Sequence, residues 1–282
     1  MGGLRVHEPL SRHTTIGVGG VANYFFSPEQ AHDLKLALDL CRDYGLPYIV
    51  FGGGSNVLFP DSGYPGMVIS TDRLRDMRIG DGWVEAAAGV FTPALLTLLN
   101  QAGERSLNFL AGIPGSLGGA IVMNAGPRGI SIGDRVDTVT VVDERGLVRK
   151  ISGGDFCFSY RTSLARDTRL IVIEARLRLD GEPYDLKGTI AAKRANQPLD
   201  QLSSGCIFKN PPGDSAGRLI EQVGLKGFRL EKAKVSEKHA NFILNLGGAS
   251  YAEIRKLIDI VREKVYKSLH ILLELEVEVI DE

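Results

Sequence analysis

Cysteine is scarce in this chain of 282 residues, which contains only Cys41, Cys157 and Cys206. An odd and sparse set argues against a disulfide framework and favours a reducing compartment, so we expect a cytoplasmic protein. Neither a Cys-x-x-Cys nor a His-Glu-x-x-His motif occurs, and the five histidines are scattered, so no metal site is expected.

Long apolar runs and an excess of one charge are also missing. No segment approaches the length that a membrane span needs, and residues 1–9 lack the apolar core of a secretory signal. The formal net charge is −1, which gives no global basic field to attract nucleic acid. We therefore expect neither membrane insertion nor nucleic-acid binding.

Glycine, in contrast, is abundant. The chain has 34 glycines, about 12% of its residues against an ordinary share of about 7%. Their apolar neighbours are typical of tight loops between packed strands and not of flexible linkers. The clusters lie at 17–20, 52–54, 112–119, 126–133 and 247–248.

The pattern of apolar residues predicts an α+β protein. Residues 29–44 predict an amphipathic helix capped by Ser27, and 47–51 predict a buried strand that leads into three glycines. Further strands are expected at 67–70, 76–79, 83–87, 136–142, 147–151, 169–179 and 271–280. Further helices are expected at 92–101 with Thr92 as its cap, 186–194, 215–223 and 250–268.

This order of elements predicts three domains. They are 1–65, 66–195 and 196–270, and the C-terminal strand at 271–282 is allowed to return to the second domain. A length of 282 residues is sufficient for two or three domains.

The segment Phe51-Gly52-Gly53-Gly54-Ser55-Asn56-Val57-Leu58 has the composition of a loop that cradles a phosphate. Three glycines permit positive φ and expose successive N–H groups, and Ser55 and Asn56 add side-chain donors. The segment contains neither Gly-Lys-Ser/Thr nor Gly-x-Gly-x-x-Gly, so it is not a Walker or Rossmann loop. A plain turn after a strand is the alternative interpretation.

A second glycine-rich segment covers 111–120 and continues to Asn124-Ala125-Gly126. Pro114-Gly115 predicts a turn, and Gly118-Gly119 lets the backbone lie flat against a ligand. Because the two segments flank one helix-and-hairpin unit, together they favour a diphosphate ligand held between domains. Two unrelated turns are the alternative.

Arg161 lies between Tyr160 and two hydroxyl-bearing residues, in a segment that also contains Phe156 and Phe158. A partly buried arginine needs an anion or a developing negative charge nearby. A surface salt bridge is the alternative role for this side chain.

The segment Ser204-Gly205-Cys206-Ile207-Phe208-Lys209-Asn210-Pro211 brings a turn, a thiol, a cation and an amide together within eight residues. Gly205 permits close approach of the backbone to a ligand, and Pro211 ends any strand that runs through the two apolar residues. The plain interpretation is a strand end with a buried free cysteine.

Three glutamates alternate with apolar residues near the end of the chain, at positions 274, 276 and 278. Strict alternation predicts a strand with one polar and one apolar face. An exposed strand face is the plain interpretation of these carboxylates, and a catalytic role for Glu276 is the alternative.

Taken together and in order, these segments resemble the UDP-N-acetylenolpyruvoylglucosamine reductase family, which are flavoenzymes of bacterial peptidoglycan precursor synthesis. The resemblance covers nearly the whole chain. It rests on Thr14-Thr15-Ile16-Gly17, the 52–58 loop, Gly112-Ile113-Pro114-Gly115, Asn124-Ala125-Gly126, Tyr160-Arg161, the 204–211 segment, Ala216-Gly217-Arg218-Leu219-Ile220-Glu221-Gln222, Leu225-Lys226-Gly227 and Leu273-Glu274-Leu275-Glu276-Val277.

The resemblance implies a two-domain FAD-binding fold of the vanillyl-alcohol oxidase type, with a third, α+β domain that binds the substrate. It implies FAD as the cofactor and NADPH as the co-substrate. The reaction would reduce UDP-N-acetyl-3-O-(1-carboxyvinyl)-glucosamine to UDP-N-acetylmuramate, a step that cell-wall synthesis and hence cell shape and division require. We expect a monomer that binds this UDP-sugar.

The resemblance also implies roles for individual residues. Arg161 and Glu276 would stabilise the developing enolate, and Cys206 would donate the proton where better-known members carry serine. A thiol is a stronger acid than an alkyl hydroxyl, so this exchange is chemically reasonable. The implied cofactor-binding residues are Gly52, Gly53, Gly54, Ser55, Asn56, Val57, Ile113, Pro114, Gly115, Ser116, Gly118, Gly119, Asn124 and Gly126. The implied substrate-binding residues are Tyr160, Lys193, Lys209, Asn210 and Gln222.

Two features leave alternatives open. The chain passes almost directly from Leu179 to Leu186, so it resembles a shorter subtype that lacks a substrate-contacting tyrosine loop. An FAD-dependent oxidase or dehydrogenase of the same fold that acts on another small substrate is one alternative. A flavin-binding protein without catalysis is the other, since Cys206 departs from the serine of better-known members.

Overall fold

The computed structural model describes residues 3–281, so Met1, Gly2 and Glu282 lie outside the described residues. The chain forms two compact units that are each discontinuous in sequence. These units are not the three predicted domains, and the predicted boundaries at 65/66 and 195/196 stay a prediction. Unit 1 is Met1–Val6, Tyr24–Gly53 and Gly66–Ala192, and unit 2 is His7–Asn23, Gly54–Pro65 and Lys193–Glu282.

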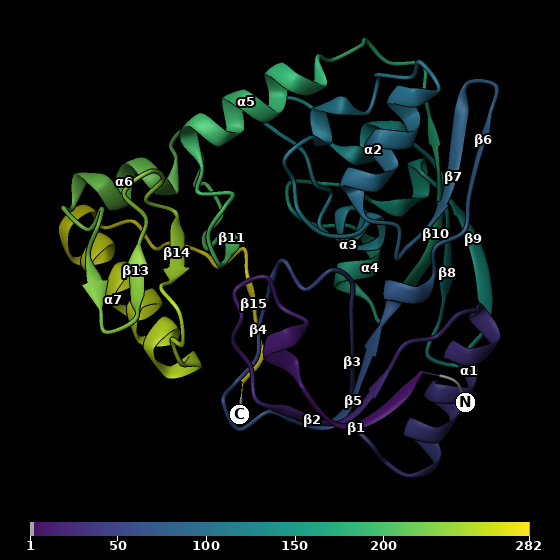
Figure 1. Ribbon diagram of the computed structural model, residues 1–282, viewed down its shortest axis with the longest axis horizontal. Helices are drawn as coiled ribbons and strands as arrows, with labels where there is room; N and C mark the ends of the chain where they lie inside the picture. The colour runs from purple at the N-terminus through teal and green to yellow at the C-terminus, as the bar shows by residue number, and fades with distance from the viewer. Residues whose placement is uncertain (1–2, 282) are drawn as a thin grey trace. The chain divides into compact units, whose positions relative to one another are not determined.

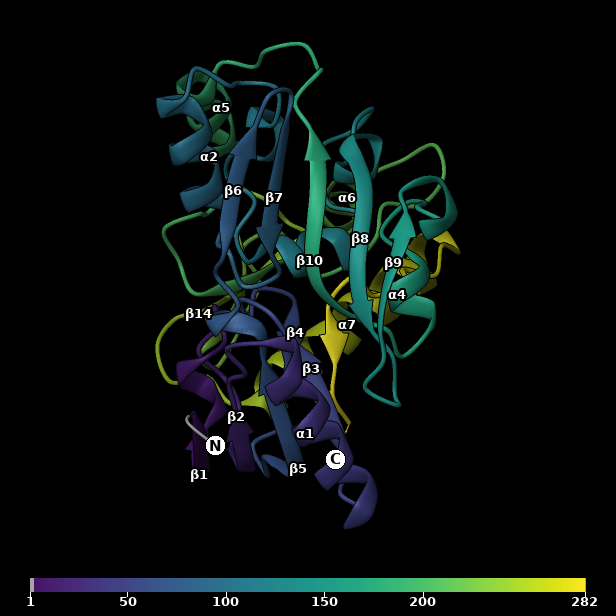
Figure 2. The same ribbon diagram turned by 90° about the vertical axis from the view of Figure 1, so that its right-hand side faces the viewer.

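Unit 1 contains an antiparallel sheet of five strands in the order β6-β7-β10-β8-β9 (Figure 2). A tight turn at 81–82 joins the first two strands, which pair Gly80 with Trp83. The strands are β6 (Met77–Gly80), β7 (Trp83–Ala87), β8 (Val136–Val142), β9 (Val148–Ser152) and β10 (Ile171–Arg178).

Two helices supply the apolar side chains that cover this sheet. The short helix α3 (Leu117–Val122) packs on β7 and β10, and α2 (Thr92–Gln101) contributes Leu95 and Leu99 to the same core. Thr92 is not the cap of α2 as predicted. Phe91 occupies that position, and the Thr92 hydroxyl is buried without a hydrogen bond.

A second, four-stranded sheet has the order β1-β2-β5-β3, with β3 and β5 parallel. Helix α1 (Ala31–Asp43) packs Leu34 and Leu38 with Met67 and Ile69 in one apolar cluster. The predicted cap at Ser27 is wrong, because Gln30 and Asp33 form a reciprocal capping box. The strands are β1 (Leu4–Pro9), β2 (Val21–Phe26), β3 (Tyr48–Phe51) and β5 (Tyr64–Ser70).

Unit 2 is built on a four-stranded sheet and the long helix α7 (Tyr251–Leu269), which lies against β13 (Figure 1). The helix expected at 250–268 is confirmed, and Ser250 and Glu253 form a reciprocal capping box at its start. The apolar side of α7 buries residues three and four apart, which include Ile254, Leu257, Ile258 and Val261. The strands are β11 (Ser203–Cys206), β12 (Arg229–Leu230), β13 (Ala233–Val235) and β14 (Phe242–Asn245), and α6 (Ala216–Gln222) is the other helix.

The C-terminal segment is not the continuous strand that we expect at 271–280. Leu275 forms an isolated bridge with Phe208, and only β15 (Glu278–Val279) joins a ladder, parallel to β4 (Val57–Leu58). The segment changes partners along its length, so no neighbour pairs with all of it. It therefore lies on β4 and on Phe208, not on the sheet of 66–195 to which the sequence allowed it to return.

The remaining described elements are short or connect the units' parts. No helix among residues 3–281 is long and apolar enough to cross a membrane, and no group of metal-ligating side chains occurs there. The helices are α4 (Leu164–Asp167) and α5 (Leu186–Asn196), and 3-10 turns lie at Leu10–Arg12, Thr71–Arg73, Asn108–Leu110, Ile132–Arg135 and Gly154–Phe156.

Candidate active site

In unit 1, the first part of the glycine loop touches the second predicted loop. A Cβ atom on Gly52 would overlap the hydroxyl oxygen of Ser116, and one on Gly53 would lie 2.8 Å from the Cα atom of Gly115. Only glycine permits two main-chain segments to approach this closely. The structure therefore brings together two of the segments that sequence analysis assigns to the cofactor.

The glycines of the second loop have different tasks. Gly115 adopts φ +106°, which only glycine tolerates, and the Ser116 hydroxyl caps α3 by accepting from the N–H of Gly119. A Cβ atom on Gly118 would lie 2.8 Å from that of Ala88, and one on Gly126 would overlap the carbonyl oxygen of Ile130. Gly118 and Gly126 are thus required by packing within unit 1, whatever they contribute to a ligand.

Asn124 joins the second loop to the segment that carries Arg161. Its side chain is buried, donates to the carbonyl oxygen of Ser159 at 2.9 Å and accepts from the N–H of Gly133 at 3.0 Å. Asn124 itself adopts φ 45°, a left-handed conformation that asparagine tolerates better than most residues. The buried amide therefore fixes the start of the Ser159–Thr162 turn against the loop at 124–126.

Arg161 reaches the same place from the other side of that turn. Its guanidinium donates to the carbonyl oxygen of Gly126 at 3.2 Å and lies 5.1 Å from the ring centroid of Tyr160. Arg161 adopts φ 58°, and Tyr160 is 52% exposed. Unit 1 thus contains the Gly52-Gly53 part of the first cofactor loop, the second cofactor loop and the predicted catalytic arginine.

The rest of the glycine loop belongs to unit 2. Gly54 has φ +63°, and a Cβ atom there would overlap the carbonyl oxygen of His13. Its own carbonyl oxygen accepts from the N–H of Thr15 at 2.9 Å, and the Thr15 hydroxyl donates to the carbonyl oxygen of Ser203 at 2.7 Å. Residues 14–17, to which sequence analysis gives no role, therefore attach this loop to the start of β11.

Asn56 links the glycine loop to the C-terminal segment. Its side-chain amide donates to the carbonyl oxygen of Glu276 at 3.0 Å, and its own carbonyl oxygen accepts from the N–H of Glu278 at 3.0 Å. Val57 then pairs with Glu278 in the parallel ladder, and Ser55 lies half-buried before it. Asn56 is predicted to bind the cofactor, and in the structure its side chain bonds to the main chain of Glu276, the predicted catalytic glutamate.

Cys206 and Glu276 are neighbours in unit 2. Cys206 is half-buried at the end of β11, just after Gly205 with φ +74°. The N–H of Glu276 donates at 2.8 Å to the carbonyl oxygen of Ile207, the residue that follows Cys206. The structure thus joins two of the three predicted catalytic residues through adjacent main-chain groups.

The predicted substrate-binding residues of this segment surround the same strand end. Lys209 forms an ion pair with Glu274 at 3.5 Å, and the Asn210 side chain accepts from the N–H of Ala216 at 3.0 Å, before α6. Gln222 ends α6 and accepts from Arg218 at 3.0 Å. The structure places Lys193 on α5, half-buried.

Arg218 has a second partner, the carboxylate of Asp214, which lies four residues earlier. Its guanidinium and the N–H of Ser215 stabilise the charged form, which lowers the pKa of Asp214 to about 2. This pair orients Arg218 towards Gln222.

Sequence analysis gives no role to Asn241 or Asn245, which are both buried in unit 2. They stand at the two ends of the apolar run 242–244. Buried amides need hydrogen-bond partners, so an asparagine at each end of an apolar strand is the signal that could identify them.

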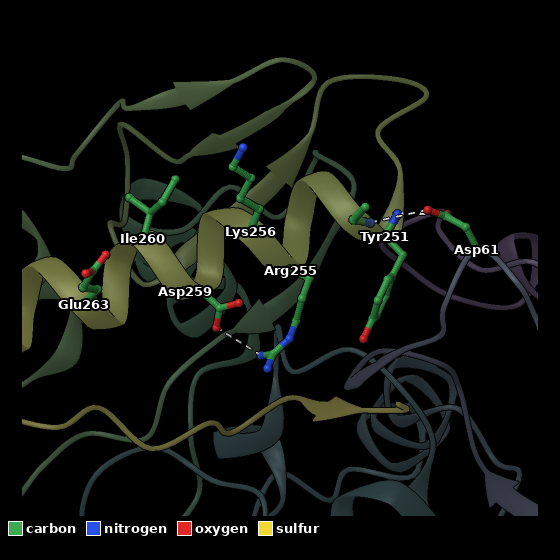
Figure 3. A pocket seen from close by; sticks show the side chains of 8 residues that line it. Asp61, Tyr251, Arg255, Lys256, Asp259, Ile260 and Glu263 are labelled. Atoms are coloured by element: carbon green, nitrogen blue, oxygen red, sulfur yellow. Dashed lines mark hydrogen bonds and ion pairs between the residues drawn. The ribbon is translucent and has the colours of Figure 1, made fainter. Parts of the chain in front are cut away.

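A hollow of about 460 Å³ lies along α7, and the predicted site residues do not line it (Figure 3). Its side chains are mostly charged, and Arg255 approaches Asp259 at 3.5 Å. Asp61 accepts from the N–H of Tyr251 at 2.9 Å, so it stabilises the start of α7. None of the eight described residues that line the hollow is a predicted site residue.

The residues present in unit 1 fit a flavin dinucleotide. The Gly52-Gly53 turn lies against the Gly115-Ser116 turn so closely that a side chain on Gly52 or Gly53 would clash with it. Main-chain N–H groups in glycine-rich turns form the concave anion sites that a diphosphate requires. Arg161 adds a positive charge beside the loop at 124–126.

Comparison with family models finds two matches along the chain. Residues 22–152 match the FAD binding domain, and residues 197–280 match the C-terminal domain of UDP-N-acetylenolpyruvoylglucosamine reductase. The matches follow the order in which the sequence predicts a cofactor-binding part and a substrate-binding part.

Known proteins are similar to this chain over almost its whole length. The UDP-N-acetylenolpyruvoylglucosamine reductase of Moorella thermoacetica is 42% identical over 277 residues, which cover 97% of this chain and 92% of the relative. That of Heliobacterium modesticaldum is 41% identical, covering 97% and 89%. The crystal structure of the reductase from Thermus caldophilus has a TM-score of 0.83 and 36% identity, and the match covers 99% of this chain and 100% of that one.

Proposed function

Because this chain belongs to the UDP-N-acetylenolpyruvoylglucosamine reductase family, we propose that it reduces UDP-N-acetyl-3-O-(1-carboxyvinyl)-glucosamine to UDP-N-acetylmuramate with NADPH. FAD, when bound, accepts hydride from NADPH and supplies it to the vinyl carbon distal to the ether oxygen. The observation that carries the proposal is the direct main-chain link between the Cys206 strand and Glu276.

In this proposal, the main-chain groups of the 52–56 loop and of 113–119 hold the cofactor's diphosphate. Gly52 and Gly53 lack the side chains that would keep the two turns apart, and Gly115 adopts the φ of +106° on which the second turn depends. Ser116 orients the second turn through its cap on α3. Asn124 and Gly126 connect the end of this segment to Ser159 and Arg161.

Arg161 stabilises negative charge on the substrate. When the vinyl group gains hydride at its distal carbon, its π electrons move towards the carbon that bears the carboxylate. An enolate develops there, and a fixed guanidinium stabilises it by charge and by hydrogen bonds. We assign Glu276 to the same enolate, as a protonated acid or through a bridging water.

Cys206 completes the reduction by giving its S–H proton to the carbon beside the carboxylate. A new C–H bond forms, the S–H bond breaks, and the resulting thiolate regains a proton from solvent. The position after Gly205 suits this role, because the half-buried thiol stands at the end of β11 and next to the Glu276 segment.

The substrate's nucleotide end requires separate contacts. We assign these contacts to Lys193, Lys209, Asn210 and Gln222, and we assign Tyr160 to the substrate as well. Lys209 and Asn210 continue directly from the Cys206 strand. The Asn210 side chain accepts a hydrogen bond from the N–H of Ala216 at the start of α6, and Gln222 ends that helix. One short segment would then serve both the reacting carbon and the diphosphate.

We further propose that the enzyme is a cytoplasmic monomer of the shorter subtype. None of Cys41, Cys157 and Cys206, which all lie within the described residues, forms a disulfide, and this fits a reducing compartment. The chain passes from β10 to α5 through only the residues between Arg178 and Leu186. Light scattering of the purified protein tests the monomer.

Two anaerobic half-reactions test the function. NADPH should reduce the bound flavin of the purified yellow protein, and the enolpyruvyl UDP-sugar should then reoxidise it with formation of UDP-N-acetylmuramate. Reduced flavin that the UDP-sugar leaves unchanged would contradict the proposal. Reoxidation by lactones or hydroxy ketones instead would favour a dehydrogenase of another specificity.

A further inference from the structure

The strand that ends in Cys206 has an irregularity just before the thiol. In β11, Ser203 pairs with Leu244 and Cys206 pairs with Phe242, so three steps on one strand oppose two on the other. Gly205 absorbs the extra residue with φ +74°. A bulge with a left-handed glycine re-aims the side chain that follows it, and here that side chain is the Cys206 thiol.

Beyond Cys206 the ladder would end, but Asn241 continues it. Its main-chain oxygen accepts from the N–H of Ile207 at 2.9 Å. Its side-chain oxygen accepts from the N–H of Phe208 at 3.0 Å, and its side-chain nitrogen donates to the Phe208 carbonyl oxygen at 2.8 Å. The carboxamide thus replaces the peptide group of a partner strand, and it is 2% exposed.

The C-terminal segment bonds to the opposite edge of the same residues. Glu276 donates to the carbonyl oxygen of Ile207, and Lys209 donates to that of Glu274, both at 2.8 Å. The other end of Glu276 is held by Asn56, which donates to its carbonyl oxygen. Residues 207–209 therefore lie between Asn241 on one edge and the Glu276 segment on the other.

We propose that Asn241 is a positioning residue that sets the Cys206 thiol and Glu276 in register for proton donation. The inference rests on the proposed function. Asn241 touches Ile207 and Phe208, the two residues after the thiol, and Ile207 in turn holds Glu276. It thereby acts on the second half-reaction without touching the reacting atoms. A carboxamide is needed because Phe208 presents both a donor and an acceptor, and burial makes either costly to leave unpaired.

Three variants test this inference. Asn241→Ala removes both side-chain hydrogen bonds. Asn241→Asp keeps the shape, but it can donate to Phe208 only when its carboxyl is protonated. Asn245→Ala is the matched control, because Asn245 is also buried and accepts from the N–H groups of Gly247 and Ala249 on the same strand's other end.

The first readout is thiol alkylation, which needs neither cofactor nor substrate. The rate of iodoacetamide modification at each cysteine is followed by peptide mass spectrometry. We expect Cys206 to react about fivefold faster in Asn241→Ala, because its strand end is released, and at the reference rate in Asn245→Ala. The exposed Cys157, which lies in unit 1, serves as the internal standard.

The second readout is the pair of half-reactions. We expect Asn241→Ala to slow reoxidation by the UDP-sugar about tenfold or more, while flavin reduction by NADPH stays within about twofold of the wild type. Asn241→Asp should approach the wild-type reoxidation rate as the pH falls, because the protonated carboxyl restores the donor.

The outcomes separate the two proposals. If the wild-type enzyme is not reoxidised by the UDP-sugar, the proposed function fails, whereas alkylation still reports on Asn241. Unchanged alkylation of Cys206 and unchanged reoxidation in Asn241→Ala would overturn the inference, as would equal changes in Asn245→Ala. If Asn241→Ala does not fold, Asn241→Asp decides: a reoxidation rate with no more pH dependence than the wild type overturns it.

Discussion

Two buried asparagines, one in each unit, hold the residues proposed for catalysis, and they do so in different surroundings. In unit 1, Asn124 joins the carbonyl oxygen of Ser159 to the N–H of Gly133, which lie in two loops. In unit 2, Asn241 bonds both main-chain groups of Phe208 at the end of a strand. The first amide ties loops to each other, and the second extends a sheet.

The difference shows how each half of the chemistry is held in place. Asn124 and Arg161 both adopt positive φ, a strained conformation for residues with side chains that persists only where surrounding contacts impose it. Cys206 instead ends a strand in which the one residue with positive φ is a glycine, Gly205, which adopts it without strain. We conclude that Arg161 depends on many loop contacts, whereas Cys206 depends on few contacts of regular type.

The largest expected effect concerns the thiol in unit 2. Cys206→Ala should slow reoxidation by the UDP-sugar by about 10²- to 10⁴-fold, because general acid catalysis contributes about that much. Reduction of the flavin by NADPH should be unaffected, and Cys206→Ser should keep substantial activity. Stopped-flow absorbance of the flavin follows both steps. Equal rates of reoxidation in the wild type and Cys206→Ala would exclude this thiol as the donor.

Adjacent glycines of one loop should respond differently, since Gly53 belongs to unit 1 and Gly54 to unit 2. Gly54→Ala forces a side chain into φ +63° and onto the carbonyl oxygen of His13, so we expect a loss of unfolding free energy of about 3 kcal/mol or more. Gly53→Ala meets only the Gly115-Ser116 turn and should cost about 1–3 kcal/mol.

Denaturant unfolding measures both glycine variants, and flavin titration distinguishes them. Gly53→Ala should weaken flavin binding more than its loss of stability predicts, because it displaces the turn proposed to hold the diphosphate. If Gly53→Ala were the more destabilising of the two, the division of this loop between the units would be wrong.

The third prediction separates the conformation of Asn124 from its hydrogen bonds. Asn124→Ala loses both bonds and places alanine at φ 45°, so we expect a loss of about 1–3 kcal/mol in unfolding free energy. Asn124→Gly loses the bonds but relieves the strain, so it should be less destabilising. Thermal unfolding compares them. Wild-type stability in Asn124→Gly would show that the two side-chain hydrogen bonds of Asn124 do not stabilise the fold.

The smallest expected effect is a pH dependence that comes from His239 in unit 2. Burial lowers the pKa of His239 from its ordinary 6.5, and its Nδ1 accepts from the N–H of Asn241 at 3.2 Å. The unfolded chain therefore binds a proton more readily than the folded one, so stability falls as the pH drops below about 6.5. The melting temperature should fall less between pH 7.5 and 5.5 in His239→Gln, and an equal fall would contradict this.

Much of the regular structure could be predicted from the sequence. Strands such as 83–87 and 136–142 lie where period-two alternation predicts them, and the capping box at Ser250 is a purely local signal. The cap at Ser27 is wrong because Asp33 can reach back to the N–H groups of Glu29 and Gln30, a competition between neighbours that residue type alone does not decide.

The site could be predicted only in part. Alternation at 274–278 predicts the faces of the C-terminal segment but not its change of partner from Phe208 to β4, since pairing depends on distant strands. The link between Cys206 and Glu276 follows from family resemblance and not from spacing. Asn241 is missed because its partner, Phe208, lies 33 positions away.

The pairing of the Asn56 loop with the Glu276 segment has a consequence for biosynthesis. Asn56 and Glu276 are 220 positions apart, so unit 2 can be completed only after the residues up to Glu276 have emerged from the ribosome. The segments of unit 1 end at Ala192 and can associate earlier, and the hydrogen bonds that join Thr15 to Gly54 and Gly20 to Pro60 can form then as well, whereas the Asn56 side chain waits for Glu276. Nascent chains stalled before Glu274 should resist protease in unit 1, and equal resistance of residues 193–273 at that stage would contradict this order. The proposed acid at Glu276 then reaches its position only after all segments of unit 1 are available.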